Sequence, residues 1–330
     1  MLRKIVMMGL LALAGGVEPG LGAIDVRTGL PGIGDSLAEL TGLDQSGMRR
    51  TAASLVGREG AVVTFLRSAD WCPSCKVQLV ELEAARAALG AAGYGLAGVT
   101  IDDVPVLARF AAERKIGFPL LAGRKAIADF AMVDQRFDAD EGRRGAPVPA
   151  VYVIDRSLVV RRIFPESERQ TVASMLAHLG IGAGAVSKPH ETRHLTATSW
   201  NSDQEVNANR RFSLGLDVSP KPTMHVYAPG DHRYRSVRLT LDRLDGLAVS
   251  PMEFPPSQPY VIKELNETVP IYGKPFRLIQ DVSIARTARG ATAVAPRTVR
   301  ITGRLEYQAC DDLVCYPSTT VPLEWKVQVK

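Results

Sequence analysis

The segment SADWCPSCKVQ (residues 68–78) decides how the first half of the chain is expected to fold, because it joins two different elements. Before it, GAVVTFL (60–66) is a short apolar run rich in β-branched residues, which is typical of a buried strand. After it, KVQLVELEAARAALG (76–90) is rich in helix-forming residues and ends at a glycine. The two cysteines are therefore predicted to lie where a strand ends and a helix begins.

The predicted position of Cys72 gives its sulfur a chemical advantage. We expect Cys72 at the N-cap of the helix, because Pro73 suits the first helical position. Backbone N–H groups and the helix dipole stabilise an anion there by roughly 0.3–1 kcal/mol, which favours a thiolate. Cys72 is thus predicted to attack a disulfide, and Cys75 to resolve the mixed disulfide that forms.

A second cysteine pair lies in YQACDDLVCYP (307–317), and the chain has four cysteines in its 330 residues. Two tight pairs are compatible with two structural disulfides, one four-cysteine zinc site or two redox centres. A disulfide that closes so short a loop restrains the unfolded chain little, which weakens the structural interpretation. A zinc site would need cysteines from two separately folded segments to converge, so no metal site is expected.

Strands and helices alternate through the rest of the first half, which predicts an α/β fold with a parallel or mixed sheet. The expected strands are 94–102, 118–123, 149–155 and 158–164, and the expected helices are 104–116, 124–132 and 167–180.

The motifs DWCPSCK (70–76) and GAPVPAVYVIDRSLVVRR (145–162) resemble the thioredoxin-like superfamily, in particular its redoxin branch of AhpC/TSA and TlpA-like proteins. The resemblance covers about 50–180 and implies a thioredoxin-like domain over 24–182 with a catalytic cysteine pair. It also implies that Pro149 follows a cis peptide bond, faces the cysteines and holds an incoming chain extended.

By the same resemblance, Trp71, Pro73 and Val148 would contact the substrate with Pro149. Two departures from the family pattern affect the chemistry. The strand before the motif offers Thr64 where a buried acid is common. The peroxiredoxin pattern P-x-x-x-T/S-x-x-C, with Cys75 as its cysteine, has Ser68 at the proline position and Cys72 at the hydroxyl position. Peroxidase activity is therefore the alternative function rather than the main one.

The pattern of the chain changes after residue 180. Segment 181–199 is glycine-rich and then polar, so 183–204 is predicted to be a linker in which His190 and His194 are solvated. Apolar residues then alternate with polar ones, which predicts an all-β immunoglobulin-like sandwich over 205–330. The expected strands are 212–218, 237–244, 276–284, 298–308 and 320–330.

The segment YQACDDLVCYPSTTVPL (307–323) resembles the N-terminal periplasmic domain of the thiol:disulfide interchange protein DsbD, as do MHVYAPG (224–230) and VPIYGKPFRL (269–278). The resemblance implies that Cys310 and Cys315 are a reactive pair. It also implies that PIYGK is a cap loop over the sulfurs, with Tyr272 as its aromatic residue.

In DsbD-type systems a thioredoxin-like domain reduces the immunoglobulin-like domain, which then reduces other proteins. The resemblance therefore implies an exchange of electrons between the two cysteine pairs, without a small-molecule cofactor. The partners it implies are periplasmic thiol/disulfide proteins and a membrane electron donor of DsbD or CcdA type. A binding module with structural disulfides is the other alternative, and it differs in that Cys310 and Cys315 would not exchange with a dithiol.

The N-terminus resembles an export signal, since Arg3 and Lys4 precede the apolar run IVMMGLLALA and small residues follow. Residues 1–23 are predicted to be a signal peptide, which places the mature protein in the periplasm; a buried helix or an uncleaved anchor is the alternative. The net charge of +5 arises from 40 basic and 35 acidic residues that are intermixed, so no nucleic-acid partner is expected.

Overall fold

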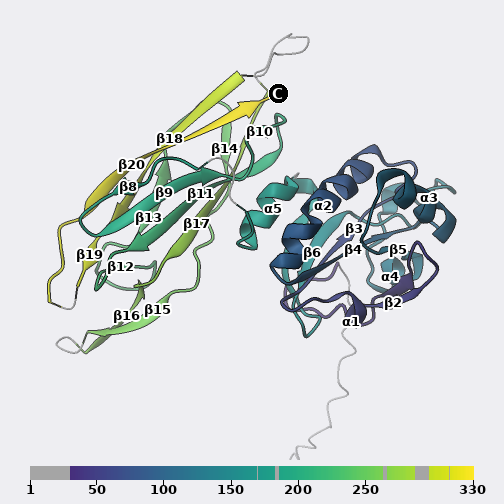
Figure 1. The fold of residues 1–330 in the computed structure, drawn as a ribbon, viewed down its shortest axis with the longest axis horizontal. Helices are drawn as coiled ribbons and strands as arrows, with labels where there is room; N and C mark the ends of the chain where they lie inside the picture. Colours follow the sequence, from purple (N-terminus) through teal and green to yellow (C-terminus); the bar gives the residue numbers. More distant parts are fainter. Residues whose placement is uncertain (1–29, 169, 183–185, 263–265, 287–296, 312) are drawn as a thin grey trace, which may run out of the picture.

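The computed structural model describes residues 30–168, 170–182, 186–262, 266–286, 297–311 and 313–330. Figure 1 shows an α/β body formed by the first half of the chain and an elongated β body formed by the second half, with helix α5 between them. The predicted signal peptide lies outside the described residues. Within the described ranges, no helix is long and apolar enough to span a membrane.

The α/β body is built on a seven-stranded mixed sheet with strand order β2-β1-β5-β4-β3-β6-β7. Strands β3, β4 and β5 are parallel to one another, whereas β6 and β7 are antiparallel to their neighbours. The strands are β1 (Thr41–Leu43), β2 (Arg49–Thr51), β3 (Gly60–Phe65), β4 (Tyr94–Thr100), β5 (Leu120–Ala122), β6 (Ala150–Ile154) and β7 (Val160–Pro165). This mixed α/β architecture is the thioredoxin-like fold that the sequence predicted.

Helices cover both faces of this sheet because its central strands are apolar on both sides. Helices α2 (Pro73–Ala91), α3 (Val104–Arg114) and α5 (Val172–His178) pack on the face that carries Val62 and Val151. Helices α1 (Ala52–Leu55) and α4 (Arg124–Asp129) pack on the other face, which carries Val63 and Tyr152. All six residues of β3 are buried, so the strand that leads to the first cysteine pair is held firmly.

The β body contains three sheets, whose strand orders are β14-β17-β11-β9-β8, β10-β20-β18-β13 and β15-β16-β12-β19. All neighbouring strands in them are antiparallel except the short pair β10 and β20. The strands are β8 (His190–Glu191), β9 (Leu195–Asn201), β10 (Glu205–Val206), β11 (Arg211–Pro220), β12 (His225–Tyr227), β13 (Arg238–Leu241), β14 (Leu247–Val249), β15 (Gln258–Ile262), β16 (Glu267–Tyr272), β17 (Phe276–Ile284), β18 (Arg297–Tyr307), β19 (Ala309–Cys310) and β20 (Thr319–Val329).

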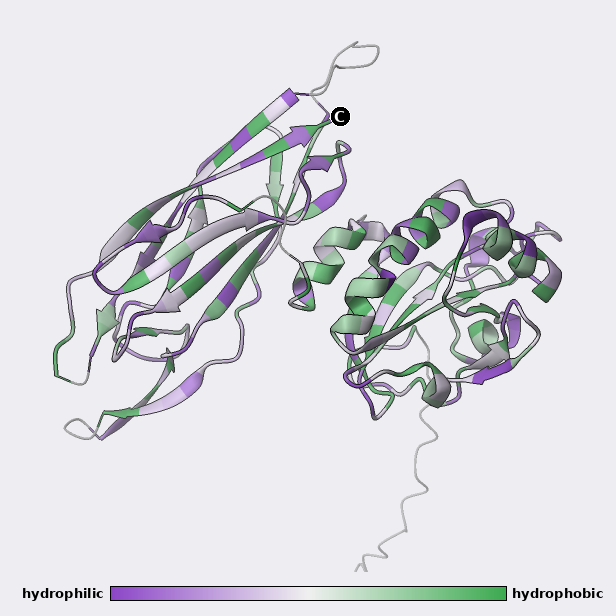
Figure 2. Cartoon of the chain, in the orientation of Figure 1, coloured by the Kyte–Doolittle hydropathy of each residue, from purple (hydrophilic) through white to green (hydrophobic). Residues whose placement is uncertain are grey.

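The main core of the β body forms from strands whose apolar residues alternate with polar ones. Figure 2 shows this alternation as successive green and purple bands along β18 and β20. The inward residues of β20 are all 5% exposed or less, among them Leu323, Trp325 and Val327. The expected sandwich is therefore confirmed, and the five strands predicted from the alternation are present as β11, β13, β17, β18 and β20.

The segment expected to be a linker differs from that prediction. Strand β9 lies inside a sheet, paired with β11 from Leu195 to Asn201, and β8 pairs with β9 on its other side. Two of its polar side chains form hydrogen bonds within the β body: Ser199 donates from Oγ to the carbonyl oxygen of Glu324 at 3.0 Å, and Thr196 donates from Oγ1 to Glu191 at 3.0 Å. His194, which was expected to be solvated, is only 8% exposed and packs on the ring of Tyr316. The expectation of a structureless segment here is wrong, because hydrogen bonding allows a polar strand to be buried.

The two bodies are joined by a polar interface at α5 rather than by a tether alone. The carboxylate of Asp281, on β17, accepts hydrogen bonds from His178 at 3.0 Å, from Gln170 at 3.0 Å and from Ser213 at 2.6 Å. The side chains of His178 and Asp281 are 10% and 11% exposed. Two ion pairs, Arg162–Glu253 and Arg211–Glu168, lie at the same interface. These contacts hold the α/β and β bodies in one arrangement.

Candidate functional site

The first cysteine pair lies at the N-terminus of α2, as the sequence predicted. Cys72 is the N-cap residue and Pro73 begins the helix. The backbone N–H of Cys75 donates a hydrogen bond to Sγ of Cys72 at 3.3 Å, and the two cysteines form a disulfide. Released as a thiolate, the sulfur of Cys72 would keep this donor and the favourable end of the helix dipole.

A buried carboxylate holds the loop before the helix. Asp102 accepts hydrogen bonds from the hydroxyl of Ser68 at 2.7 Å, the backbone N–H of Ala69 at 2.6 Å and the hydroxyl of Thr100 at 3.0 Å. The strand before the motif, β3, contains no acidic residue. The acid beside this loop instead follows β4, the neighbouring parallel strand, because the carboxyl ends of parallel strands meet at one edge of the sheet.

The two sulfurs of this pair differ in what they face. Both cysteines are at most 3% exposed. Cys75 borders a cavity of about 560 Å³, and Cys72 is not among the residues that line it. Helix position therefore favours Cys72 as a thiolate, whereas Cys75 is the cysteine that borders the cavity.

The expected cis-proline is wrong. None of the described peptide bonds is cis, so the bond before Pro149 is trans. The trans isomer is intrinsically preferred by about 0.5–1 kcal/mol, and here the segment satisfies its hydrogen bonds without a cis bond. The N–H of Val148 donates to the carbonyl oxygen of Met132 at 2.8 Å, and the carbonyl oxygen of Pro149 accepts from the N–H of Glu166 at 3.0 Å. Pro149 still borders the cavity at Cys75.

The other three residues of this domain that were expected to contact substrate, Trp71, Pro73 and Val148, are not among the residues that line this cavity. Trp71 is partly buried, with its ring 5.6 Å from that of Phe137 and the guanidinium of Arg143 4.9 Å above it. Pro73 is exposed in the first turn of α2. The structure therefore brings Pro149 and Cys75 to one cavity and leaves Trp71 and Pro73 outside its lining.

The second cysteine pair lies at a tip of the β body. Cys310 pairs with His225 across β19 and β12 and is 1% exposed, whereas its disulfide partner Cys315 is exposed. Within this segment, Leu313 is 93% exposed and Val314 is 51% exposed. Cys310 is thus a buried residue, whereas Cys315 is an exposed residue beside an apolar surface.

Asp311 shapes the loop that carries these residues. Its carboxylate accepts hydrogen bonds from the N–H groups of Leu313 at 2.8 Å and Val314 at 2.7 Å, and from the hydroxyl of Tyr316 at 2.8 Å. The hydrogen bond from the Leu313 N–H, together with the others, lowers the pKa of Asp311. The carboxylate is therefore ionised near neutral pH and fixes the turn between the two cysteines.

Tyr227 is the polar group closest to this disulfide that the structure reveals. Its hydroxyl lies 3.1 Å from Sγ of Cys310 and 3.4 Å from Sγ of Cys315. Burial raises the pKa of Tyr227 to about 12, so the hydroxyl stays protonated and can donate to a sulfur. The ring of Tyr234 stacks on it at 4.3 Å. Tyr227 belongs to the motif MHVYAPG (224–230), but nothing in its local sequence indicated that it would lie beside the cysteines.

The residue expected as the aromatic cap has a different position. Tyr272 belongs to the main core, stacks on Phe276 at 4.2 Å and donates its hydroxyl hydrogen to the carbonyl oxygen of Pro255. Side chains alternate along β16, so its neighbour Ile271 points the other way and packs in the cluster of Cys310 and Tyr227. The structure therefore brings Ile271, rather than Tyr272, to the cysteine pair.

Comparison with protein families assigns both halves of the chain. Residues 33–163 match the AhpC/TSA family, and residues 196–324 match the N-terminal domain of the thiol:disulfide interchange protein DsbD. The chain is an AhpC/TSA redoxin domain followed by a DsbD N-terminal-like domain. Each of these two domains contains one of the cysteine pairs, so the chain has the components of thiol-based redox chemistry.

Individual relatives and solved structures that are similar to the chain include peroxiredoxins. The 1-Cys peroxiredoxin B of Oryza sativa subsp. japonica is 24% identical over 220 residues, which cover 60% of this chain and 97% of the relative. Among solved structures, peroxidoxin BcpB from Mycobacterium tuberculosis is 22% identical with a TM-score of 0.38, and the match covers 42% of this chain and 87% of that one. Peroxiredoxin Q from Xanthomonas campestris is 18% identical with a TM-score of 0.38, covering 46% and 95%.

Proposed function

We propose that the chain is an extracytoplasmic thiol–disulfide oxidoreductase that passes electrons between its two cysteine pairs and on to protein thiols and disulfides. The observation that carries the proposal is that each disulfide has one cysteine at a cavity or at the surface. Cys75 borders a cavity, and Cys315 is exposed while its partner is buried. Two disulfides that only stabilised the fold would not need a cysteine in either position.

The exchange step at the second pair follows from its geometry. A thiolate of the AhpC/TSA domain attacks Sγ of Cys315, a new S–S bond forms, and the Cys310–Cys315 bond breaks with Cys310 leaving as a thiolate. The hydroxyl of Tyr227 lies 3.1 Å from that sulfur and can donate to it. The second thiol of the attacking pair then resolves the mixed disulfide, so two electrons and two protons reach the Cys310–Cys315 pair.

The arrangement of the two domains constrains how the pairs can meet. Figure 1 shows β19, which carries Cys310, at the end of the β body remote from the α/β body, whereas α2 begins within the α/β body. Exchange within one chain requires the α5 interface to open. Exchange between two copies requires only that the tip of one chain reaches the first centre of another.

A trapping experiment tests the relay. Cys310→Ser combined with Cys72→Ser or with Cys75→Ser leaves one thiol in each pair and removes both thiols that could release a bound partner. Under mild oxidation a mixed disulfide between Cys315 and the remaining cysteine of the first pair should therefore accumulate. We expect peptide mapping to find Cys315 joined to Cys72 or Cys75, with the double variant Cys310→Ser/Cys315→Ser as the control. A non-reducing gel then separates linkage within one chain from linkage between two. If Cys315 forms adducts only with added thiols, the two pairs do not exchange electrons and the relay is wrong.

Peroxide reduction is the second candidate, because residues 33–163 match the AhpC/TSA family and the relatives of the chain include 1-Cys peroxiredoxin B. The site lacks two of the pattern's supports: Ser68 occupies the proline position, and its hydroxyl is bound to Asp102. Cys72 occupies the hydroxyl position and is in a disulfide with Cys75. We therefore expect the reduced protein to consume hydrogen peroxide at the slow rate of an ordinary thiol. Stopped-flow oxidation faster by several orders of magnitude would make peroxidase the main function.

The partners and location belong to the same proposal. The similarity of residues 196–324 to the DsbD N-terminal domain supports exchange with periplasmic thiol/disulfide proteins, with electrons supplied by a membrane donor of DsbD or CcdA type. The predicted signal peptide over 1–23 supports export. N-terminal sequencing of the mature protein from a periplasmic fraction tests this location, and recovery of the intact chain from the cytoplasm would contradict it.

A further inference from the structure

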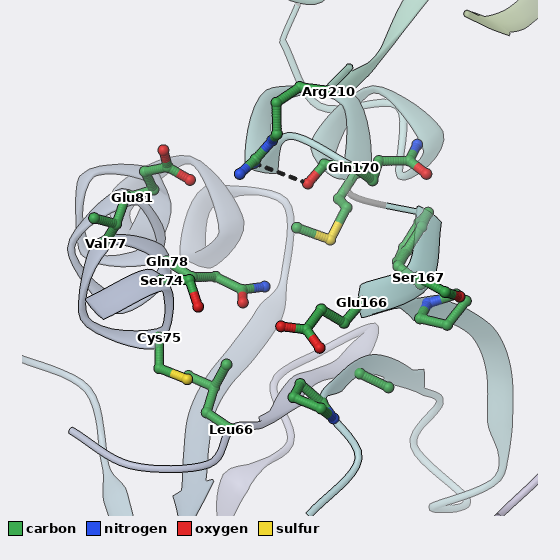
Figure 3. Close-up of a pocket in the computed structure, with 15 residues that line it drawn as sticks. Leu66, Ser74, Cys75, Val77, Gln78, Glu81, Glu166, Ser167, Gln170 and Arg210 are labelled. Carbon is green, nitrogen blue, oxygen red and sulfur yellow. Dashed lines mark hydrogen bonds between the residues drawn. The ribbon is translucent and has the colours of Figure 1, made fainter. Parts of the chain in front are cut away.

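The cavity at Cys75 is bordered by both domains. Most of its lining comes from the AhpC/TSA domain, but Arg210 precedes β11 of the DsbD N-terminal-like domain. In Figure 3, Cys75 lies at one end of the cavity and Arg210 at the other, and the side chains of Gln78 and Glu166 point into the space between them. The volume of about 560 Å³ is within the range of small-molecule sites, roughly 300–1,000 Å³. The second domain therefore completes a cavity that the first domain does not close alone.

The charged groups of the cavity have opposite signs. Arg210 donates from Nη2 to the carbonyl oxygen of Gln170 at 3.1 Å, while its Nε is buried and, among the described residues, has no hydrogen-bond partner. Glu81 lies on α2 at the same end, where burial raises the pKa of its carboxyl and the charge of Arg210 opposes that rise. Glu166 lines the cavity closer to Cys75 and is paired with Arg67. A ligand that carries both a carboxylate and an ammonium group would match this arrangement.

The strand edge beside the cysteines is already occupied. An extended polypeptide would need free backbone groups next to Pro149 to pair with it as an added strand. The N–H of Val148 instead donates to the carbonyl oxygen of Met132, and the N–H of Asp134 donates to the carbonyl oxygen of Ala146 at 2.8 Å. Because the chain's own segment 132–134 pairs with this edge, an added strand cannot pair there, whereas the cavity reaches Cys75.

We propose that this cavity binds a small zwitterionic disulfide of the amino-acid or short-peptide class, with a carboxylate at Arg210, an ammonium group at Glu81 or Glu166, and the disulfide at Cys75. The inference rests on the proposed thiol–disulfide exchange and names a substrate class for its first centre. Apolar side chains, among them Phe164 and Met175, would pack against the carbon skeleton of the ligand.

The reaction is balanced by the chain's own dithiol. In the reduced protein, the thiolate of Cys75 attacks one sulfur of the ligand; a Cys75–ligand disulfide forms, and half of the ligand leaves as a thiolate. Cys72, at the helix N-cap, then attacks Sγ of Cys75, re-forms the Cys72–Cys75 disulfide and releases the second half. The ligand gains two electrons, and the two protons of the dithiol pass to the two released thiols. Dithiothreitol supplies the next pair of electrons in the assay.

The test uses the full chain with glutathione disulfide as the charged probe and hydroxyethyl disulfide as the uncharged one. We expect Arg210→Gln to lower the ratio of the two reduction rates about tenfold, because only the charged probe uses the guanidinium. Arg162→Gln is the matched control, since Arg162 also forms an interdomain ion pair, with Glu253, but does not line this cavity. In that variant the ratio should stay within about twofold of the unaltered protein.

A second measurement identifies the sulfur. Cys72→Ser should trap glutathione on Cys75, as seen by mass spectrometry of the intact protein and of its peptides, and Cys75→Ser should form the adduct on Cys72 at least tenfold more slowly. The proposal is overturned if Arg210→Gln lowers the reduction rates of glutathione disulfide and hydroxyethyl disulfide equally. It is also overturned if glutathione is trapped on Cys72 as rapidly as on Cys75. Either outcome is separate from failure of the relay, in which the combined Cys72→Ser/Cys310→Ser variant would show no link between the two pairs although glutathione still reacts at Cys75.

Discussion

The two cysteine pairs carry the same type of bond but are presented in different ways. In the first pair Cys75 borders a cavity shaped by two domains, and the sulfur of Cys72 accepts a backbone N–H. In the second pair Cys315 is an exposed residue, and the sulfur of Cys310 lies beside a tyrosine hydroxyl. The first pair is thus suited to select a ligand by shape and charge, and the second to meet a partner's surface.

The largest effects should come from removing each pair in turn. Cys72→Ser/Cys75→Ser should abolish reduction of glutathione disulfide, by roughly 100-fold or more, because serine forms no reactive thiolate. Cys310→Ser/Cys315→Ser should leave that reaction within about twofold, since the cavity does not include the tip. A comparable loss in both double variants, measured as release of glutathione, would show that the two pairs do not act as separate sites.

The next effect concerns the interface that completes the cavity. Burial alone would raise the pKa of Asp281, but hydrogen bonds from His178, Ser213 and Gln170 outweigh it and lower the pKa. We expect Asp281→Asn to reduce the free energy of unfolding by about 2 kcal/mol at pH 7, because an amide cannot accept all these bonds. Urea unfolding and limited proteolysis between residues 178 and 211 measure the change.

The pH dependence gives this prediction a sign. A carboxylate with a lowered pKa in the folded state stabilises the protein above its ordinary pKa of 3.8, and that contribution is lost as the pH falls through the folded value. The difference in the free energy of unfolding between Asp281→Asn and the unaltered protein should therefore shrink below about pH 4. Asp217→Asn, which removes a more exposed ion pair with Arg277, is the control and should cost less than about 1 kcal/mol. A difference that grows in acid would contradict the assignment.

A smaller effect is expected at the tip. Tyr227→Phe removes the hydroxyl beside Cys310, and a hydrogen bond to a charged group contributes about 1.5 kcal/mol, so opening of this disulfide by dithiothreitol should slow roughly tenfold. Because the pKa of Tyr227 is raised to about 12, the tyrosine stays protonated and the fold-reduction in the rate of disulfide opening should be constant between pH 6 and 9. Tyr234→Phe is the control, since its hydroxyl donates to Glu267 instead. Equal slowing in both variants would point to altered packing of the rings.

The smallest effect on stability is expected from Leu313→Asp, since Leu313 is 93% exposed. Its unfolding free energy should change by less than about 0.5 kcal/mol. Reduction of the tip by a protein dithiol should nevertheless slow several-fold, while reduction by dithiothreitol should not change. Val249→Asp, at an exposed position of β14, should alter neither rate. If both reductants slow in Leu313→Asp, the residue shapes the disulfide rather than the docking surface.

The sequence predicted those parts of the fold that depend on local pattern. Short stretches of sequence show the alternation of apolar and polar residues in β18 and β20 and the change from strand β3 to helix α2, and the structure confirms both. Strand β9 was missed because its sequence LTATSWN is rich in hydroxyl residues that a linker would also contain. Its burial depends on pairing with β11, which no local pattern contains.

The site was predictable to the same extent. The N-cap position of Cys72 follows from neighbouring residues, but the contact between Tyr227 and Cys310 depends on the pairing of β12 with β19, across 83 positions of sequence. The expected role of Tyr272 was wrong because side chains alternate along β16, so that Ile271 and not Tyr272 packs beside the cysteines. Asp102 could have been found by asking which residue follows the neighbouring parallel strand.

The turn held by Asp311 has a consequence for repeated use of the tip. Its three hydrogen bonds do not involve either sulfur, so the loop keeps them when the Cys310–Cys315 bond is opened. The two thiols then stay near each other, and each acts on the other at a high effective concentration instead of drifting apart with the chain. Re-oxidation should therefore require little rearrangement of the backbone. If exchange stalls with a partner still joined to one sulfur, the neighbouring thiol would attack that mixed disulfide and release the partner.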